Sequence, residues 1–216
     1  MALADVLGWT ATLLQTVLAV PQLVRLVRTR NVEGLSLVGW QTALVLNLAW
    51  TWHGLSIDQL PQTLSSALSL FTTIPILVLM TRELGRSLVR TVLPSVAVAA
   101  SMIAVGVLGG SGAYGLVAIL PGIAITAAQT VELVRADHVR GVSPLSLVLG
   151  FLNLSLWLVW AVMVDDSGTV IAVGATWVVA AFNMVWYVLR RLGLRAYFAR
   201  GIGAAEPVPV AVAEFE

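Results

Sequence analysis

The sequence predicts an all-α membrane protein with seven transmembrane helices, arranged as two parallel three-helix bundles joined by a linker helix. Three observations lead to this prediction: an apolar composition, arginines confined to alternate loops, and an internal repeat. Of the 216 residues, 59% are hydrophobic and only 11% are charged, and the mean hydropathy is +0.94. This composition leaves too little polar surface to coat a soluble globule.

Seven apolar runs alternate with charged or turn-rich breaks. A spanning helix needs about 20 apolar residues, so each run is long enough to cross a bilayer. The predicted spans are residues 5–24, 36–55, 60–80, 91–108, 113–131, 144–164 and 169–189. They leave no room for a sizeable soluble domain, which excludes most classes of soluble enzyme.

The basic residues define the orientation, because short basic loops stay in the cytoplasm. All twelve are arginines, and they follow the first, third, fifth and seventh spans: Arg25, Arg28, Arg30, Arg82, Arg86, Arg90, Arg135, Arg140, Arg190, Arg191, Arg195 and Arg200. We therefore expect the N-terminus outside and the C-terminus inside the cell, in the plasma membrane. A cleaved signal peptide does not fit the first span, because no positive charge precedes it.

The composition also argues against several kinds of site. There are no cysteines and only two histidines, His53 and His138, so sulfur-based metal sites and histidine clusters are excluded. The spans contain no paired carboxylates and no serine beside a base. We expect no catalysis, no cofactor, no metal and no nucleic-acid partner, and the sequence leaves open whether the chain forms a homo-oligomer.

One internal repeat stands out, in which residues 22–36 match residues 129–143 at eight of fifteen positions. Val and Leu matches are common by chance in a membrane chain, so the polar and glycine identities carry the weight. Those pairs are Gln22/Gln129, Arg28/Arg135, Gly34/Gly141 and Ser36/Ser143, and further along Trp50 aligns with Trp157.

The repeat spacing of 107 residues predicts the architecture. Each copy holds three spans, and an odd number of spans would invert the second copy unless one extra helix crossed the membrane between them. The fourth span has no counterpart and is rich in small residues, which suits a linker. We therefore expect a first bundle at residues 1–86, a linker helix at 87–110, a second bundle at 111–200 and a disordered tail at 201–216.

With Pro21-Gln22, a basic stretch and then Val32-Glu33-Gly34-Leu35-Ser36, the chain resembles the PQ-loop superfamily, which includes the SWEET and semiSWEET sugar transporters and lysosomal amino-acid exporters. The resemblance extends over nearly the whole chain, with His53 in place of a family tyrosine and Ala128 in place of a proline. It implies a seven-helix facilitator that moves small polar solutes, most often sugars, by alternating access between parallel repeats.

Aromatic and amide side chains suggest where a solute binds. Trp50 and Trp157 occupy one repeat position, with Asn47 or Asn153 about one turn earlier. An indole ring covers the CH face of a sugar while amides bind its hydroxyls. On the third helix of each bundle, where sugar-transporting relatives use an asparagine, the first copy has Ser66 and its neighbours and the second has Asn183.

Prolines and glutamines suggest where the helices bend and close. Pro21 removes a backbone hydrogen bond near the cytoplasmic end of the first span, which makes it a candidate hinge. Gln22 and Gln129 are predicted to hold the cytoplasmic ends of the bundles together. Pro121 and Pro144 are the corresponding candidates in the second copy. Asp137 and Arg140, and Glu33 with a nearby arginine, are predicted to form exposed ion pairs.

Three functions are compatible with these features. The first is a sugar-type uniporter, favoured because nothing titratable lies near the middle of a span. The second is a proton-coupled exporter of amino acids or other metabolites. The third is a receptor built on the same bundle, which would bind without moving solute. His53, near the outer end of its span, is the one group expected to give transport a modest pH dependence.

Overall fold

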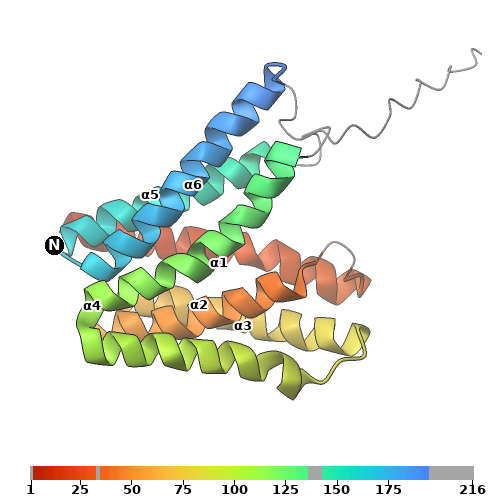
Figure 1. Cartoon of the computed structure of the whole chain (residues 1–216), viewed down its shortest axis with the longest axis horizontal. Coiled ribbons are helices and arrows are strands. Elements are labelled where there is room, and N and C mark those ends of the chain that lie inside the picture. The colour runs from red at the N-terminus through yellow and green to blue at the C-terminus, as the bar shows by residue number, and fades with distance from the viewer. Residues whose placement is uncertain (1, 33–34, 136–142, 195–216) are drawn as a thin grey trace, which may run out of the picture.

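The computed structural model describes residues 2–32, 35–135 and 143–194, and the only regular secondary structure in these residues is α-helix (Figure 1). The helices are α1 (Ala2–Thr29), α2 (Leu37–Ser56), α3 (Leu60–Glu83), α4 (Leu88–Arg135), α5 (Pro144–Met163) and α6 (Ser167–Arg191). Five of them, α1 and α3 to α6, are long and apolar enough to cross a membrane. The chain is therefore an all-α, multi-pass membrane protein.

Helix α4 joins the predicted fourth and fifth spans into one element of 48 residues. At about 1.5 Å per residue, a straight helix of this length would exceed twice the thickness of the hydrocarbon core. It is not straight, because Gly110 has φ 77° and ψ −175°, a conformation that needs a glycine. In Figure 1 the chain turns back on itself where the yellow-green first half meets the green second half. The predicted break at 109–112 is thus a kink and not a loop.

Successive helices alternate in direction and give the bundle two chemically different ends. At one end α2 and α5 finish, α3 and α6 begin, and Asp58, Asp165 and Asp166 lie between them; we call this the aspartate end. The opposite end is the arginine end, where α1 and α3 finish in residues that include Arg25, Arg28, Arg30 and Arg82. Gly110 turns α4 at the aspartate end.

Six helical segments close a ring. Helix α3 packs between α1 and α2, and α6 packs between α5 and α4. The ring is completed by contacts of α1 with α5 and of α2 with α4. Helix α6 contacts the second half of α4. There the Asn183 amide donates a hydrogen bond to the Thr126 carbonyl, and the Trp186 indole donates one to the Leu133 carbonyl.

Local structure repeats at the spacing of 107 residues. Ser36 and Ser143 each cap the helix that follows, accepting from the amides of Gly39 and Ser146 respectively, which satisfies orphan amides of the first turn. The turns at the aspartate end also match, since Asp58 and Asp165 both adopt a left-handed conformation, at φ 55° and 58°. The repeated serines of the sequence are therefore equivalent helix caps.

Tertiary packing repeats at the same spacing. Leu26 and Leu133 are fully buried, and each lies in a cluster near the arginine end. At the other end, a Cβ on Gly8 would lie 2.9 Å from Pro61, and a Cβ on Gly115 would lie 2.5 Å from the backbone of Gly168. Close approach of α1 to α3 is thus matched by close approach of α4 to α6, at equivalent positions.

Candidate functional site

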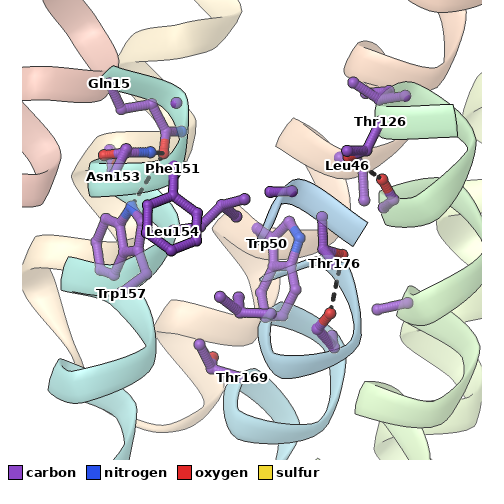
Figure 2. Close-up of a pocket in the computed structure, with 18 of the residues that line it drawn as sticks. Gln15, Leu46, Trp50, Thr126, Phe151, Asn153, Leu154, Trp157, Thr169 and Thr176 are labelled. Atoms are coloured by element: carbon purple, nitrogen blue, oxygen red, sulfur yellow. Dashed lines mark hydrogen bonds between the residues drawn. The ribbon is translucent and has the colours of Figure 1, made fainter. Parts of the chain in front are cut away.

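A cavity of about 370 Å³ lies inside the ring, and all six helices contribute to its wall (Figure 2). Five of the six predicted solute-binding residues line it: Asn47, Trp50, Ser66, Asn153 and Trp157. The lining side chains among the described residues carry amides, hydroxyls and aromatic rings but no formal charge. Such a wall suits a neutral polar solute.

Trp50 and Trp157 lie in equivalent surroundings. The Trp50 ring meets His53 edge-on at a centroid distance of 5.3 Å, and Trp157 meets Trp160 edge-on at 5.2 Å. His53 and Trp160 are themselves equivalent positions, 107 residues apart. Each tryptophan is thus held by the aromatic residue three positions later, which fixes the ring against the cavity.

Gln15 is a central polar residue of the wall that the sequence analysis missed. Its Oε1 accepts a hydrogen bond from Trp157 Nε1 at 3.1 Å and a longer one from Asn153 Nδ2 at 3.5 Å. Its Nε2 donates to Ser69 Oγ at 3.4 Å. Figure 2 shows Gln15, Asn153 and Trp157 together on one side of the cavity. The repeat could not reveal this residue, because the equivalent position is Gly122.

Two polar atoms of the wall have no hydrogen-bond partner within the described part of the chain: Ser65 Oγ and Asn153 Oδ1. Buried polar atoms in proteins are nearly always paired, because an unpaired one retains its desolvation penalty. Both residues line the cavity. A solute or water in the cavity would supply the missing partners.

Gln62 and Thr169 bridge the two sides of the ring at the aspartate end of the cavity. Thr169 Oγ1 donates to Gln62 Oε1 at 3.3 Å, and the residues are only 5% and 1% exposed. At the arginine end the cavity extends to the first turn of α5, where the exposed Ser146 forms part of its wall. The cavity is therefore sealed from one end and reaches toward the other.

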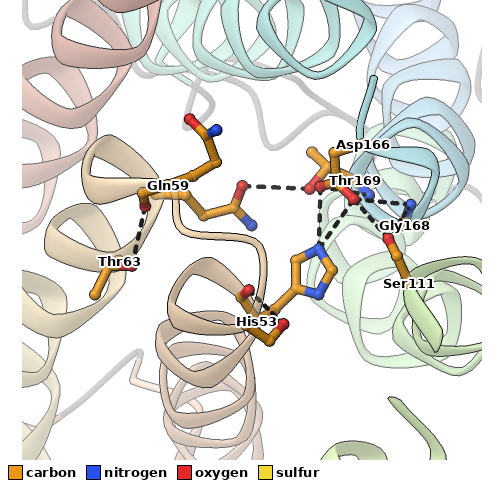
Figure 3. A network of polar contacts seen from close by, with 9 residues as sticks. His53, Gln59, Thr63, Ser111, Asp166, Gly168 and Thr169 are labelled. Carbon is orange, nitrogen blue, oxygen red and sulfur yellow. Dashed lines mark hydrogen bonds and ion pairs between the residues drawn. The ribbon is translucent and has the colours of Figure 1, made fainter. Parts of the chain in front are cut away.

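His53 and Asp166 form a buried ion pair beside this bridge, with His53 Nε2 at 3.0 Å from Asp166 Oδ2 (Figure 3). Ser111 donates to Asp166 Oδ1 at 2.6 Å, and Asp166 caps α6 by accepting from the amides of Gly168 and Thr169. The carboxylate only accepts hydrogen bonds, so His53 carries a proton on Nε2. This network joins α2, the kink of α4 and the start of α6.

The electrostatics of the network favour an ionised Asp166. Burial alone would raise the pKa of Asp166, but hydrogen bonds from His53, Ser111 and Thr169 and the nearby charge of His53 lower that pKa to about 2. Tyr114 stacks on the His53 ring at a centroid distance of 4.4 Å. The sequence analysis placed His53 near the outer end of its span, but nothing in it indicated a contact with Asp166.

The predicted hinge and closing residues are scattered. Pro21 is exposed within α1, which runs on to Thr29. Pro121 lies inside α4 and lines a separate apolar groove beside α2, and Pro144 opens α5. Gln129 lines the cavity, whereas Gln22 does not, and no hydrogen bond joins the two amides in the structure as described.

Asn183 is placed beside the cavity and not in its wall. It is fully buried, and its Nδ2 donates to the Thr126 carbonyl at 3.5 Å. Its role in the structure is to join α6 to α4. The predicted ion pairs of Glu33, Asp137 and Arg140 lie outside the described residues. At the arginine end a different pair is seen, an exposed contact of 3.9 Å between Arg30 and Glu83.

Comparison with models of known protein families gives a match at the N-terminal part of the chain. Residues 3–53, which cover α1 and most of α2, match the family model of the PQ loop repeat. This segment holds Gln15, Asn47, Trp50 and His53. No curated protein matches the chain.

Proposed function

Because residues 3–53 match the PQ loop repeat, we propose that the chain is a PQ-loop protein and a facilitative transporter of small, uncharged polar solutes, with sugars as the leading class. The observation that carries the proposal is the uncharged cavity inside the helical ring, with Trp50 and Trp157 at equivalent positions in its wall. Several helices long and apolar enough to cross a membrane fit transport or reception better than catalysis.

In this proposal the seven helical segments form two parallel three-helix units. The first unit is α1 to α3, the first half of α4 is the linker, and the second unit is the second half of α4 with α5 and α6. Support comes from the helix caps, turns and close contacts that recur at 107 residues. The cavity then lies on the pseudo-twofold axis, as in transporters built from parallel repeats.

Alternating access would proceed by rocking of these units about the cavity. With the arginine end in the cytoplasm and the N-terminus outside, the described conformation is sealed outside by Gln62 and Thr169. Pro21 remains the proposed hinge of α1. The plasma membrane is the proposed location, with lipid and the solute as partners.

Uptake into proteoliposomes tests this function. The purified chain should equilibrate labelled sugars across the bilayer, and the same sugars should raise its melting temperature. A protonophore should leave the final accumulation unchanged, because no ionisable side chain lines the described cavity. Melting-temperature shifts without flux would favour a receptor.

A proton-coupled exporter is the second candidate, and the His53–Asp166 pair is the observation that favours it. An ionisable pair that links the two units can couple its protonation to their separation. Uphill accumulation driven by an imposed pH gradient would support this candidate against the uniporter.

A further inference from the structure

The cavity has two walls that are related by the repeat but differ in chemistry. Seven pairs of residues at the spacing of 107 line it at both positions. The first wall, from α1, α3 and α5, consists of Gln15, Gln62, Ser65, Ser66, Asn153, Leu154 and Trp157. The second wall consists of their counterparts on α4, α6 and α2: Gly122, Thr169, Ala172, Val173, Leu46, Asn47 and Trp50.

Four of the seven pairs are polar on the first wall and apolar on the second. Gln15 corresponds to Gly122, Ser65 to Ala172, Ser66 to Val173 and Asn153 to Leu46. Only the pair of Leu154 and Asn47 is reversed. In the two remaining pairs, both members are of one kind: Trp50 and Trp157 are both aromatic, and Gln62 and Thr169 are both polar.

The reversed pair adds little polarity to the second wall. Asn47 Nδ2 already donates to Thr73 Oγ1 at 2.9 Å. Ala118 and Ile125 of α4 add further apolar surface to the same side. Thr126 and Gln129 of α4 and Thr176 of α6 also line that side, and the two threonine hydroxyls donate to backbone carbonyls of their own helices. By contrast, the two unpaired polar atoms of the cavity, Ser65 Oγ and Asn153 Oδ1, both belong to the first wall.

We propose that the transported solute is an uncharged ring molecule with one hydroxylated face and one apolar face, such as a deoxy sugar, bound in one orientation. Its hydroxyls pair with Gln15, Ser65 and Asn153 on the first wall. Its apolar face packs on Leu46, Val173 and Trp50 of the second wall. This inference rests on the proposed transport function and narrows its substrate class.

The physical reason is the cost of removing polar groups from water. A hydroxyl directed at Leu46, Ala172 or Val173 would lose its hydration without gaining a partner, whereas a methyl or CH face gains by burial there. On the first wall the opposite holds, because the unpaired protein atoms need donors or acceptors. A solute with hydroxyls on every side therefore fits this cavity less well than one that lacks them on one face.

Matched sugars that differ by one hydroxyl test the inference. D-galactose and D-fucose, its 6-deoxy form, make one pair; D-glucose and 6-deoxy-D-glucose make the other. Uptake into proteoliposomes should favour the deoxy member of at least one pair by about tenfold in flux at low concentration, the scale of discrimination that an apolar pocket achieves. Equal uptake within both pairs, or preference for the parent sugars, would overturn the inference.

A variant that copies the first wall onto the second provides the complementary test. Ala172→Ser with Val173→Ser reproduces Ser65 and Ser66 at their equivalent positions. The preference for the deoxy sugar should fall toward unity, because parent sugars gain hydrogen bonds on the second wall. Val178→Ser is the matched control, since Val178 lies on the same helix but is 62% exposed on its outer face.

The outcomes separate this inference from the proposed function. Flux of all four sugars without preference would support the transport function and contradict the inference that the solute has one apolar face. Neither flux nor a melting-temperature shift with any of the four would remove both. A preference that the double serine variant leaves unchanged would also overturn the assignment of the second wall.

Discussion

Thr169 donates a hydrogen bond to Gln62 at 3.3 Å, and the two residues are separated by 107 positions, the spacing of the internal repeat. Residues at equivalent positions of two repeats can touch only near the axis that relates them. In the proposed arrangement of two parallel units, this contact lies on the pseudo-twofold axis, at the aspartate end of the cavity. Separation of the two halves of the ring at this end must break it.

Asp166→Ala should lower the free energy of unfolding by about 3 kcal/mol, because it removes the cap of α6 and leaves His53 buried without its partner. Asp165→Asn is the matched control, since Asp165 is the exposed neighbour in the same turn. Thermal unfolding in detergent measures both variants. A loss for Asp166→Ala no larger than that for the control would show that the pair does not stabilise the fold.

Acid should weaken this contribution in a defined range. The pKa of Asp166 is about 2 in the folded chain, below its ordinary value near 4. A depressed carboxyl pKa contributes stability that is present above about pH 4 and is lost as pH falls through 2. The stability difference between the wild type and Asp166→Asn should accordingly shrink between pH 4 and pH 2. A difference that stays constant over that range would contradict the ionised pair.

Trp50→Ala and Trp157→Ala should each weaken solute affinity while leaving insertion intact. A stacked ring contributes on the order of 1 kcal/mol, which corresponds to roughly a fivefold loss of affinity. Trp157→Ala should have the larger effect, because Trp157 also donates to Gln15. Trp9→Ala is the control, since Trp9 is 45% exposed on α1. Unchanged uptake by a well-expressed variant with both substitutions would show that neither tryptophan contributes to solute binding.

Gln15→Leu should reduce affinity by tenfold or more, because Trp157 Nε1 and Asn153 Nδ2 lose their common acceptor. Gln41→Leu makes the same change outside the cavity, where Gln41 donates to the Thr91 carbonyl at 2.6 Å and joins α2 to α4. That control should affect stability and not affinity. Solute-dependent thermal shifts distinguish the two effects, and equal affinity losses in both variants would argue against a special role for Gln15.

Features that depend on periodicity and repetition could be predicted from the sequence. The apolar runs gave the helices, and the register of 107 residues paired Ser36 with Ser143 as caps and Trp50 with Trp157 at the cavity. Such features are visible because the same local chemistry occurs twice. The join of the fourth and fifth helices was missed because glycine-rich breaks look alike whether they form a loop or a kink.

Features that depend on asymmetry could not be predicted in this way. Gln15 has a glycine as its counterpart, so comparison of the two copies hides it. His53 and Asp166 are 113 residues apart, and their contact depends on the packing of α2 against α4 and of α4 against α6. Asn183 was expected in the cavity as a buried amide, but in the structure it lies beside the cavity and its Nδ2 donates to the Thr126 carbonyl.

Cross-linking across the axis tests alternating access most directly, and the absence of native cysteines makes it selective. Gln62→Cys and Thr169→Cys place two thiols where the side chains now touch, and a short reducible thiol cross-linker would join them. The account predicts that joined thiols abolish solute flux in proteoliposomes, that reduction restores it, and that the cross-linker does not change the flux of either single-cysteine variant. Full flux with the cross-link formed would contradict a pathway that opens at Gln62 and Thr169.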